Sequence, residues 1–203
     1  MKKLITMAAI VVVSTVASPA FAQDSKPFHG PWVGATAGYD VFDAGDGEGE
    51  DEGGSEDGFA YGVALGYDYN LGNFVLGVEG EIGDSSVSAS DTDVFEDGDE
   101  LILKAGRDLY AGIRLGVPVN DTLMIYAKGG YTNQRFNLAY TLDDETESDG
   151  DNIGGFRLGA GAEFAFGQGF GRLEYRYSDY GSFSDTDLET SRHQIMLTAG
   201  MRF

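Results

Sequence analysis

The sequence predicts an all-β protein, an eight-stranded antiparallel up-and-down transmembrane β-barrel. Three observations lead to this prediction. Apolar residues alternate with small or polar residues in segment after segment, which is the period of a β-strand. Short and long polar connections between these segments also alternate strictly. Glycine accounts for 31 of the 203 residues while proline contributes only 4, a composition that favours closely packed strands.

The first residues have the pattern of an export signal. Lys2 and Lys3 precede an apolar run over residues 4–17, and residues 18–22 end in an Ala-x-Ala pattern. This arrangement predicts a signal peptide over residues 1–22, cleaved before Gln23, and one barrel domain over residues 23–203. The apolar run is shorter than the roughly 20 residues that a spanning helix needs. Cysteine is absent, so the exported domain has to be held together without disulfides.

The alternation defines eight strands of sufficient length to cross a membrane at a tilt. In the last of them Ile195, Leu197 and Ala199 share one face, while Gln194 and Thr198 share the other. A soluble β-sandwich also has one apolar face, but its other face is normally solvated and highly charged. Here the second face is rich in Gly, Ala and Thr with a few charges of both signs, which fits a narrow lumen. The expected strands cover residues 32–42, 59–70, 73–84, 105–117, 122–141, 153–166, 169–180 and 190–203.

The connections predict the topology. Tight turns are expected at residues 70–73, 118–121 and 167–169. In barrels of the outer membrane, short turns face the periplasm and long loops face outward. We therefore expect four long outward loops, at residues 43–58, 85–104, 142–152 and 181–189.

Several motifs resemble a known family. They include Trp32-Val33-Gly34 in the first strand, Gly159-x-Gly161-x-Glu163 in the sixth, the run from Leu173 to Tyr177 in the seventh, and Met201-Arg202-Phe203 in the last. With these motifs the chain resembles the eight-stranded barrels related to the transmembrane domain of outer-membrane protein A, and in particular the porin-like surface antigens of alphaproteobacteria.

The resemblance implies a location in the cell outer membrane of a Gram-negative bacterium, in contact with outer-membrane lipid and lipopolysaccharide. It also implies that Phe203 belongs to a signal read by the barrel-assembly machinery. Members of this family serve as envelope structural proteins, adhesins, antigens and pores, so the resemblance specifies the fold and leaves the activity open.

Charged residues of both signs fall on the face predicted to line the lumen. An eight-stranded barrel is just wide enough for side chains to fill its interior, and buried charges there have to pair. We therefore expect an internal ion-pair network that holds the barrel closed. The alternative is a narrow polar pathway for small solutes, lined by the same residues. The ten residues are Glu79, Glu81, Arg114, Lys128, Arg157, Glu163, Arg172, Glu174, Arg176 and Arg202.

Most of the remaining charge is acidic and lies in the expected outward loops. The whole chain carries a formal charge of −21, and residues 43–57 alone contain eight acids. This sign excludes nucleic acid as a partner. Asp46-x-Glu48-x-Glu50 lacks the downstream glycine and bidentate glutamate of an EF-hand, so weak condensation of divalent cations is a better expectation than a dedicated metal site. We expect no cofactor, and a solvated coat that can meet host or environmental surfaces.

No catalytic residues are expected, so we predict that the protein is not an enzyme. The chain has only two histidines. His29 precedes the first strand, and His193 shares a face with Phe203, so it is expected to face lipid and not a cleft. Aromatic residues near strand ends are expected to form the girdles of a membrane barrel. They are Tyr39, Tyr67, Tyr69, Phe164, Phe166, Tyr175 and Tyr177.

The sequence thus favours a structural protein of the envelope that also presents a surface to the environment. A small passive porin-like channel for ions or solutes is the first alternative. An adhesin or surface antigen acting through the acidic loops is the second.

Overall fold

A computed structural model describes residues 27–45, 54–92, 100–142, 145–180 and 189–203. The expected signal peptide, residues 1–22, lies outside this part. Within it every element is a β-strand, and no helix is long and apolar enough to cross a membrane. The strands are β1 (Gly30–Gly45), β2 (Gly54–Asn70), β3 (Val75–Ser85), β4 (Ser88–Thr92), β5 (Glu100–Pro118), β6 (Leu123–Leu142), β7 (Glu145–Phe166), β8 (Gly169–Tyr180) and β9 (Glu189–Arg202).

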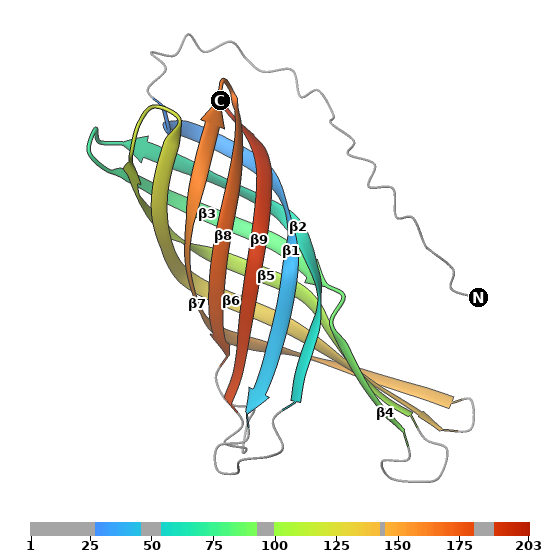
Figure 1. Ribbon diagram of the computed structural model, residues 1–203. Coiled ribbons are helices and arrows are strands. Elements are labelled where there is room, and N and C mark those ends of the chain that lie inside the picture. Colours follow the sequence, from blue (N-terminus) through green and yellow to red (C-terminus); the bar gives the residue numbers. More distant parts are fainter. Residues whose placement is uncertain (1–26, 46–53, 93–99, 143–144, 181–188) are drawn as a thin grey trace, which may run out of the picture.

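The strands form a closed antiparallel barrel (Figure 1). Each strand except β3 pairs with the next strand along the chain, β1 pairs with β9, and β3 pairs with β5 to complete the ring. β4 pairs with the part of β5 that lies beyond β3, so β3 and β4 are two segments of one wall strand. The wall therefore has the predicted eight strands, and the fold class is confirmed.

The strands were predicted too short at the ends that lead into the long connections. β6 and β7 pair continuously from Leu123↔Phe164 to Leu142↔Glu145, so the loop expected at residues 142–152 is wrong. β1 and β2 likewise stay paired out to Ala44↔Gly54, and β4 occupies part of the loop expected at 85–104. Once a hairpin has left the membrane, backbone pairing continues without an apolar face, and the alternation that marks a spanning strand disappears.

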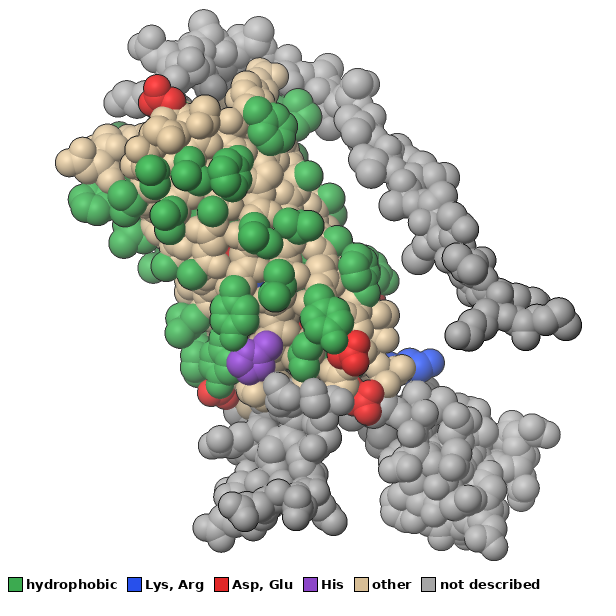
Figure 2. All heavy atoms as spheres, viewed as in Figure 1, with side chains coloured by type: hydrophobic (Ala, Val, Ile, Leu, Met, Phe, Trp, Pro, Cys, Tyr) green, Lys and Arg blue, Asp and Glu red, His purple; other side chains and the backbone are tan. Residues whose placement is uncertain are grey.

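The two faces of the wall separate as the alternation predicts. Large apolar side chains cover the outside, where Leu65, Ile113 and Leu197 each expose more than 60% of their surface (Figure 2). Charged and polar side chains point inward. An apolar exterior around a polar interior is the arrangement of a membrane barrel and is the reverse of a soluble one.

A β-bulge interrupts this alternation in β5. The register to β6 shifts between Ala105, which pairs with Phe136, and Asp108, which pairs with Gln134. The extra residue leaves Arg107 exposed between two buried neighbours, Gly106 and Asp108. As a result Ala105 faces inward and Lys104 faces outward, the opposite of what unbroken alternation along β5 would give.

Candidate functional site in the barrel lumen

The structure brings all ten of the predicted lumen residues into the barrel interior, and each of them makes at least one ion pair. Inward residues of different strands meet across the lumen because the barrel is narrow. Four further charged residues, Asp40, Asp68, Asp108 and Arg192, join them and were not among the predicted ten. Together the fourteen comprise seven cations and seven carboxylates, so this described set carries no net charge.

The alternation of inward and outward positions along each strand could have identified the four missed residues. Asp40 shares a face with Trp32 and Thr36, and Arg192 shares one with Gln194. Asp68 and Asp108 follow the same rule in β2 and β5. Each of the four is at most 6% exposed.

The larger group, which we name the turn-side cluster, contains five cations and five carboxylates. Arg114 bridges Asp68 and Glu163, with Nη1 2.9 Å from Glu163 Oε2. Arg202 bridges the same two carboxylates, each at 2.7 Å. The cluster consists of Asp68, Glu79, Glu81, Arg114, Lys128, Glu163, Arg172, Glu174, Arg176 and Arg202.

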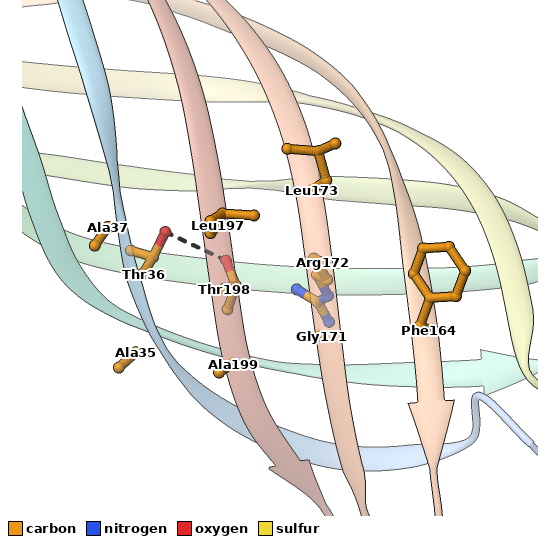
Figure 3. Close-up of a pocket in the computed structure, with 10 residues that line it drawn as sticks. All are labelled: Ala35, Thr36, Ala37, Phe164, Gly171, Arg172, Leu173, Leu197, Thr198 and Ala199. Atoms are coloured by element: carbon orange, nitrogen blue, oxygen red, sulfur yellow. Dashed lines mark hydrogen bonds between the residues drawn. The ribbon is translucent and has the colours of Figure 1, made fainter. Parts of the chain in front are cut away.

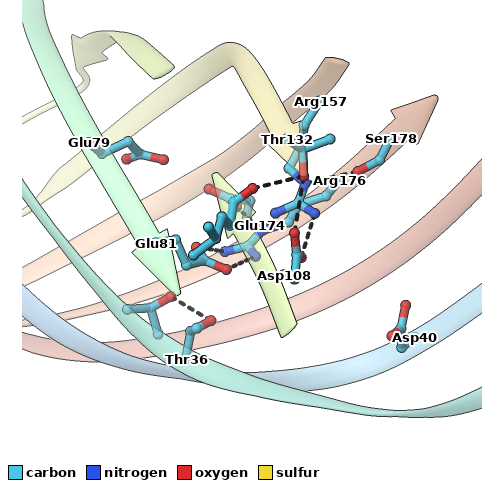
Figure 4. Close-up of polar contacts among 12 residues, drawn as sticks. Thr36, Asp40, Glu79, Glu81, Asp108, Thr132, Arg157, Glu174, Arg176 and Ser178 are labelled. Atoms are coloured by element: carbon cyan, nitrogen blue, oxygen red, sulfur yellow. Dashed lines mark hydrogen bonds and ion pairs between the residues drawn. The ribbon is translucent and has the colours of Figure 1, made fainter. Parts of the chain in front are cut away.

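The turn-side cluster extends to the middle of the lumen (Figure 4). Lys128 Nζ lies 2.7 Å from Glu79 Oε1 and 2.8 Å from Glu174 Oε1. Arg176 pairs with Glu174 and donates two hydrogen bonds to Glu81, of 2.5 and 2.9 Å. These contacts connect β3, β6 and β8 across the lumen and not only along the wall.

A second group, the loop-side cluster, consists of Asp40, Asp108, Arg157 and Arg192. Asp108 Oδ2 lies 2.6 Å from Arg157 Nη2 and 2.9 Å from Arg192 Nη1. Neutral groups complete the arrangement, because Arg157 donates to Ser178 and Arg192 donates to Gln134. Each arginine is therefore held by a carboxylate and by further acceptors, which is what makes a buried charge tolerable.

Apolar residues fill both ends of the lumen. On the loop side Phe42, Phe136 and Tyr180 pack with smaller residues. On the turn side Phe28, Val75 and Met124 form one cluster, and Trp32 and Phe170 form another. Phe28 lies in the left-handed region, with φ 57°, and is 1% exposed, so the chain adopts a strained conformation to place this ring. Both ion-pair clusters lie between these apolar layers.

Aromatic rings also contact the buried arginines. Arg172 lies 3.8 Å from the centre of the Trp32 ring and 4.5 Å from that of Phe170. Arg114 lies 4.9 Å from the Tyr126 ring, and Tyr126 donates a 2.6 Å hydrogen bond to Glu174. Such cation–π contacts add to the stabilisation of desolvated guanidinium groups.

The other predicted positions lie outside the lumen. Phe203 is half-buried, and its backbone N–H donates to Pro31 O at 2.8 Å, which continues the pairing of β9 with β1. His193 Nδ1 lies 2.7 Å from Tyr175 OH, and the His193 ring packs against Tyr177. His29 Nδ1 accepts a hydrogen bond from Asn70 N, and its ring contacts Tyr67 and Tyr69. The densest acidic run, residues 46–53, lies outside the described residues, so the structure does not bear on cation binding there.

Two shallow grooves mark the outer, membrane-facing surface. One, of about 590 Å³, runs over small residues of β1, β8 and β9, among them Ala35, Gly171 and Ala199 (Figure 3). The other, of about 540 Å³, lies over β2, β3, β5 and β6. Within the described part of the chain no group of three or more His, Cys, Asp or Glu side chains could hold a metal ion.

Comparison with known proteins gives a consistent result. A family model described as outer membrane protein beta-barrel domain matches residues 8–203. The 25 kDa outer-membrane immunogenic protein of Brucella ovis is 32% identical over 126 residues, which cover 62% of this chain and 57% of the relative, little more than half of its length.

Among solved structures, Neisserial surface protein A is similar with a TM-score of 0.56 and 14% identity, covering 85% of this chain and 97% of that one. The attachment invasion locus protein of Yersinia pestis has a TM-score of 0.49 and 17% identity, covering 86% of this chain and 99% of that one. At 14% identity the likeness to Neisserial surface protein A concerns the fold.

Proposed function

Because the chain belongs to the family of outer membrane protein β-barrel domains, we propose that it is a non-catalytic structural protein of the outer membrane, whose barrel is a filled anchor for the segments that it presents outside the cell. The cell outer membrane is its location. The observation that carries the proposal is the content of the lumen, where seven cations and seven carboxylates pair between two apolar layers.

A filled lumen favours an anchor over the channel alternative. Arg114, Arg157, Arg176 and Arg192 are each at most 2% exposed, so these long side chains occupy the interior and do not line an open path. A conducting pore keeps its charged side chains in contact with water. Opening a path here would require breaking several buried ion pairs at once, at a cost of several kcal/mol.

Single-channel recording in planar bilayers tests this proposal. Refolded protein, shown to be folded by its heat-modifiable migration on a gel, should give no discrete openings. The D40A/R192A double variant, which shortens two side chains on the loop side, should also give no openings, because the turn-side cluster and both apolar layers remain in the lumen. Reproducible openings from the folded wild-type protein would make the channel alternative primary.

The structural role itself is tested in the natural host. Deleting the gene should increase leakage of a periplasmic enzyme and sensitivity to detergent, and the wild-type protein should restore both. A deletion strain that leaks no more than its parent would contradict an envelope role.

A role as a surface antigen is the second candidate. It is supported by the pairing of β6 with β7 far beyond the lumen, out to Leu142↔Glu145, and by the relative named for its immunogenicity. An epitope tag inserted between Asp143 and Asp144 should bind antibody on intact cells, whereas the same tag between Asn120 and Asp121 should bind only after the envelope is opened. Labelling of both tags, or of neither, on intact cells would oppose this topology.

A further inference from the structure

The cations of the described chain are distributed unevenly. Of its ten Lys and Arg residues, seven lie in the lumen. The other three, Lys104, Arg107 and Arg135, all face outward on β5 and β6. In a chain of net charge −21, every described exterior cation is therefore gathered at one place, which we name the cationic patch.

The register of the strands makes this patch compact. Lys104 is the partner of Asn137 in the β5–β6 pairing, and Arg135 is the partner of Asn152 in the β6–β7 pairing. The β-bulge turns Lys104 outward, to the same face as Arg107, and Arg107 Nη2 donates to Asn152 Oδ1 at 3.2 Å. Arg135 Nε donates to Asn137 Oδ1 at 3.2 Å.

The hydrogen-bond partners of Arg107 and Arg135 are thus neutral amides. No carboxylate whose side chain the structure describes forms an ion pair with the three cations. Asp84 of β3 also faces outward at this height, and its carboxylate accepts a hydrogen bond from the backbone N–H of Ser85. The patch therefore retains its positive charge and several N–H donors for a ligand.

The patch lies at the boundary between the apolar band and the outward segments. On β5 the outward residues run Ile113, Ala111, Leu109 and then Arg107, and on β6 Tyr131 is followed by Asn133 and Arg135. Lipid headgroups occupy this height, just beyond the apolar band of a barrel. Because the long connections are on this side, the leaflet concerned is the outer one.

An apolar groove leads directly to the patch. Its floor is formed by Gly80 and Ala111, which are partners in the β3–β5 pairing. Leu65, Ile82, Leu109 and Tyr131 form its sides, and Asn133 lies at its outward end, two residues before Arg135. A groove of about 540 Å³ beneath a cationic patch has the form of a site for an amphiphile with an acyl chain and an anionic head.

We propose that the groove and the cationic patch together bind one phosphorylated glycolipid of the outer leaflet, of the lipopolysaccharide class. The phosphate lies against Arg107 and Arg135, with Lys104 adding charge, and an acyl chain lies over Gly80 and Ala111. Arginine suits this role because its planar fork holds phosphate through two hydrogen bonds. The site deepens the proposed function, since it would fix one lipid to the wall of the anchor.

Two different variants test the two halves of the site. R107Q/R135Q removes two charges and keeps hydrogen-bonding side chains. G80L places a side chain in the groove, and the Cβ on residue 80 would meet only Tyr110 O, at an ordinary contact distance of 3.7 Å.

G171L is the matched control in the other groove. A Cβ on Gly171 would also find only ordinary contacts, at 3.9 and 4.0 Å, and the outward end of that groove leads to Tyr39 and Tyr175 with no described cation. Each variant is checked for folding by its heat-modifiable gel shift before use.

The measurement is native mass spectrometry of detergent-refolded protein titrated with lipid A and, separately, with inorganic phosphate. Wild-type protein and G171L should bind one lipid A with equal affinity. R107Q/R135Q should bind it about tenfold or more weakly, because each Lys or Arg near an anionic lipid headgroup strengthens the electrostatic attraction. G80L should weaken binding severalfold.

Two outcomes would overturn the proposal. The first is equal affinity of the wild-type protein and R107Q/R135Q for lipid A. The second is a loss of lipid A affinity in R107Q/R135Q with no loss in G80L, while G80L and the wild-type protein bind inorganic phosphate equally. That result would indicate an anion site that takes no lipid. Neither outcome depends on whether the barrel conducts, so it would leave the proposed anchor role standing.

Discussion

Arg192 and Asp40 form a two-pronged ion pair that joins the last strand of the barrel to the first. Arg192 Nε lies 2.7 Å from Asp40 Oδ1, and Arg192 Nη2 lies 2.6 Å from Asp40 Oδ2. Both side chains are fully buried, and β1 and β9 are the first and last strands, whose pairing helps to close the barrel. The seam of the barrel is thus held by side chains as well as by backbone hydrogen bonds.

Removing one charged partner of this pair should destabilise the barrel strongly. R192M leaves the carboxylate of Asp40 buried with only the Ser85 hydroxyl, 2.6 Å away, to hydrogen-bond it. We expect the free energy of unfolding to fall by about 3–5 kcal/mol. The measurement is urea unfolding in phospholipid vesicles, followed by the fluorescence of Trp32, the single tryptophan.

The double variant D40N/R192M provides the control for this prediction. It removes the unpaired charge, so it should lose clearly less stability than R192M alone. If the two proteins unfold at the same urea concentration, the pair does not act as a charge pair, and the lumen network would have to be reconsidered.

The sequence could predict the faces of the strands because alternation has a fixed period of two. That rule gave the ten lumen residues, and the same parity includes Asp40, Asp68, Asp108 and Arg192. The alternation could not predict which lumen residues form ion pairs with each other. Arg192 and Asp40 are 152 residues apart, and their meeting depends on how the wall closes.

The bulge in β5 and the long outward hairpins could not be predicted from the sequence for a different reason. A bulge exchanges the inward and outward positions of all residues beyond it, and a single glycine, Gly106, is not enough to predict one. Strand pairing outside the membrane requires no apolar face, so the acidic stretch from Glu145 to Asp151 gave no sign that it belongs to β7. Both features position the cationic patch, which for that reason could not be found from the sequence.

A charge placed on the outer face should be costly only within the membrane. Leu197 and Leu71 are almost equally exposed, at 62% and 63%, but Leu197 lies in the middle of β9 and Leu71 lies in the turn after β2. L197R should reduce the free energy of unfolding by about 2–4 kcal/mol, whereas L71R should change it by at most about 1 kcal/mol. Both are measured by the same urea unfolding in vesicles, and equal effects would argue against an embedded outer face.

Close approach of neighbouring strands should make some glycines irreplaceable and leave others free. A Cβ on Gly130 would collide with Ala111 O and Gly112 Cα, so the backbone would have to move. G130A should therefore lower the free energy of unfolding by about 1–3 kcal/mol. G80A, whose Cβ has room, should change it by less than about 0.5 kcal/mol. A G130A protein as stable as G80A would show that this part of the wall is looser than the structure describes.

The outward extension of β6 and β7 should be separable from the anchor. Asn137 and Gly150 are partners in the pairing of these strands, so residues 138–149 can be replaced by a two-residue Asn-Gly turn that closes the shortened hairpin. Both ion-pair clusters, and the apolar layer of Phe42, Phe136 and Tyr180, are made without the replaced residues. The shortened protein should therefore keep its heat-modifiable gel shift, and its free energy of unfolding should change by less than about 1 kcal/mol. Antibodies raised against whole cells should bind it less than they bind the wild-type protein. A shortened protein that no longer folds would show instead that the extension contributes to the barrel, and the division between a filled anchor and a presented surface would then be wrong.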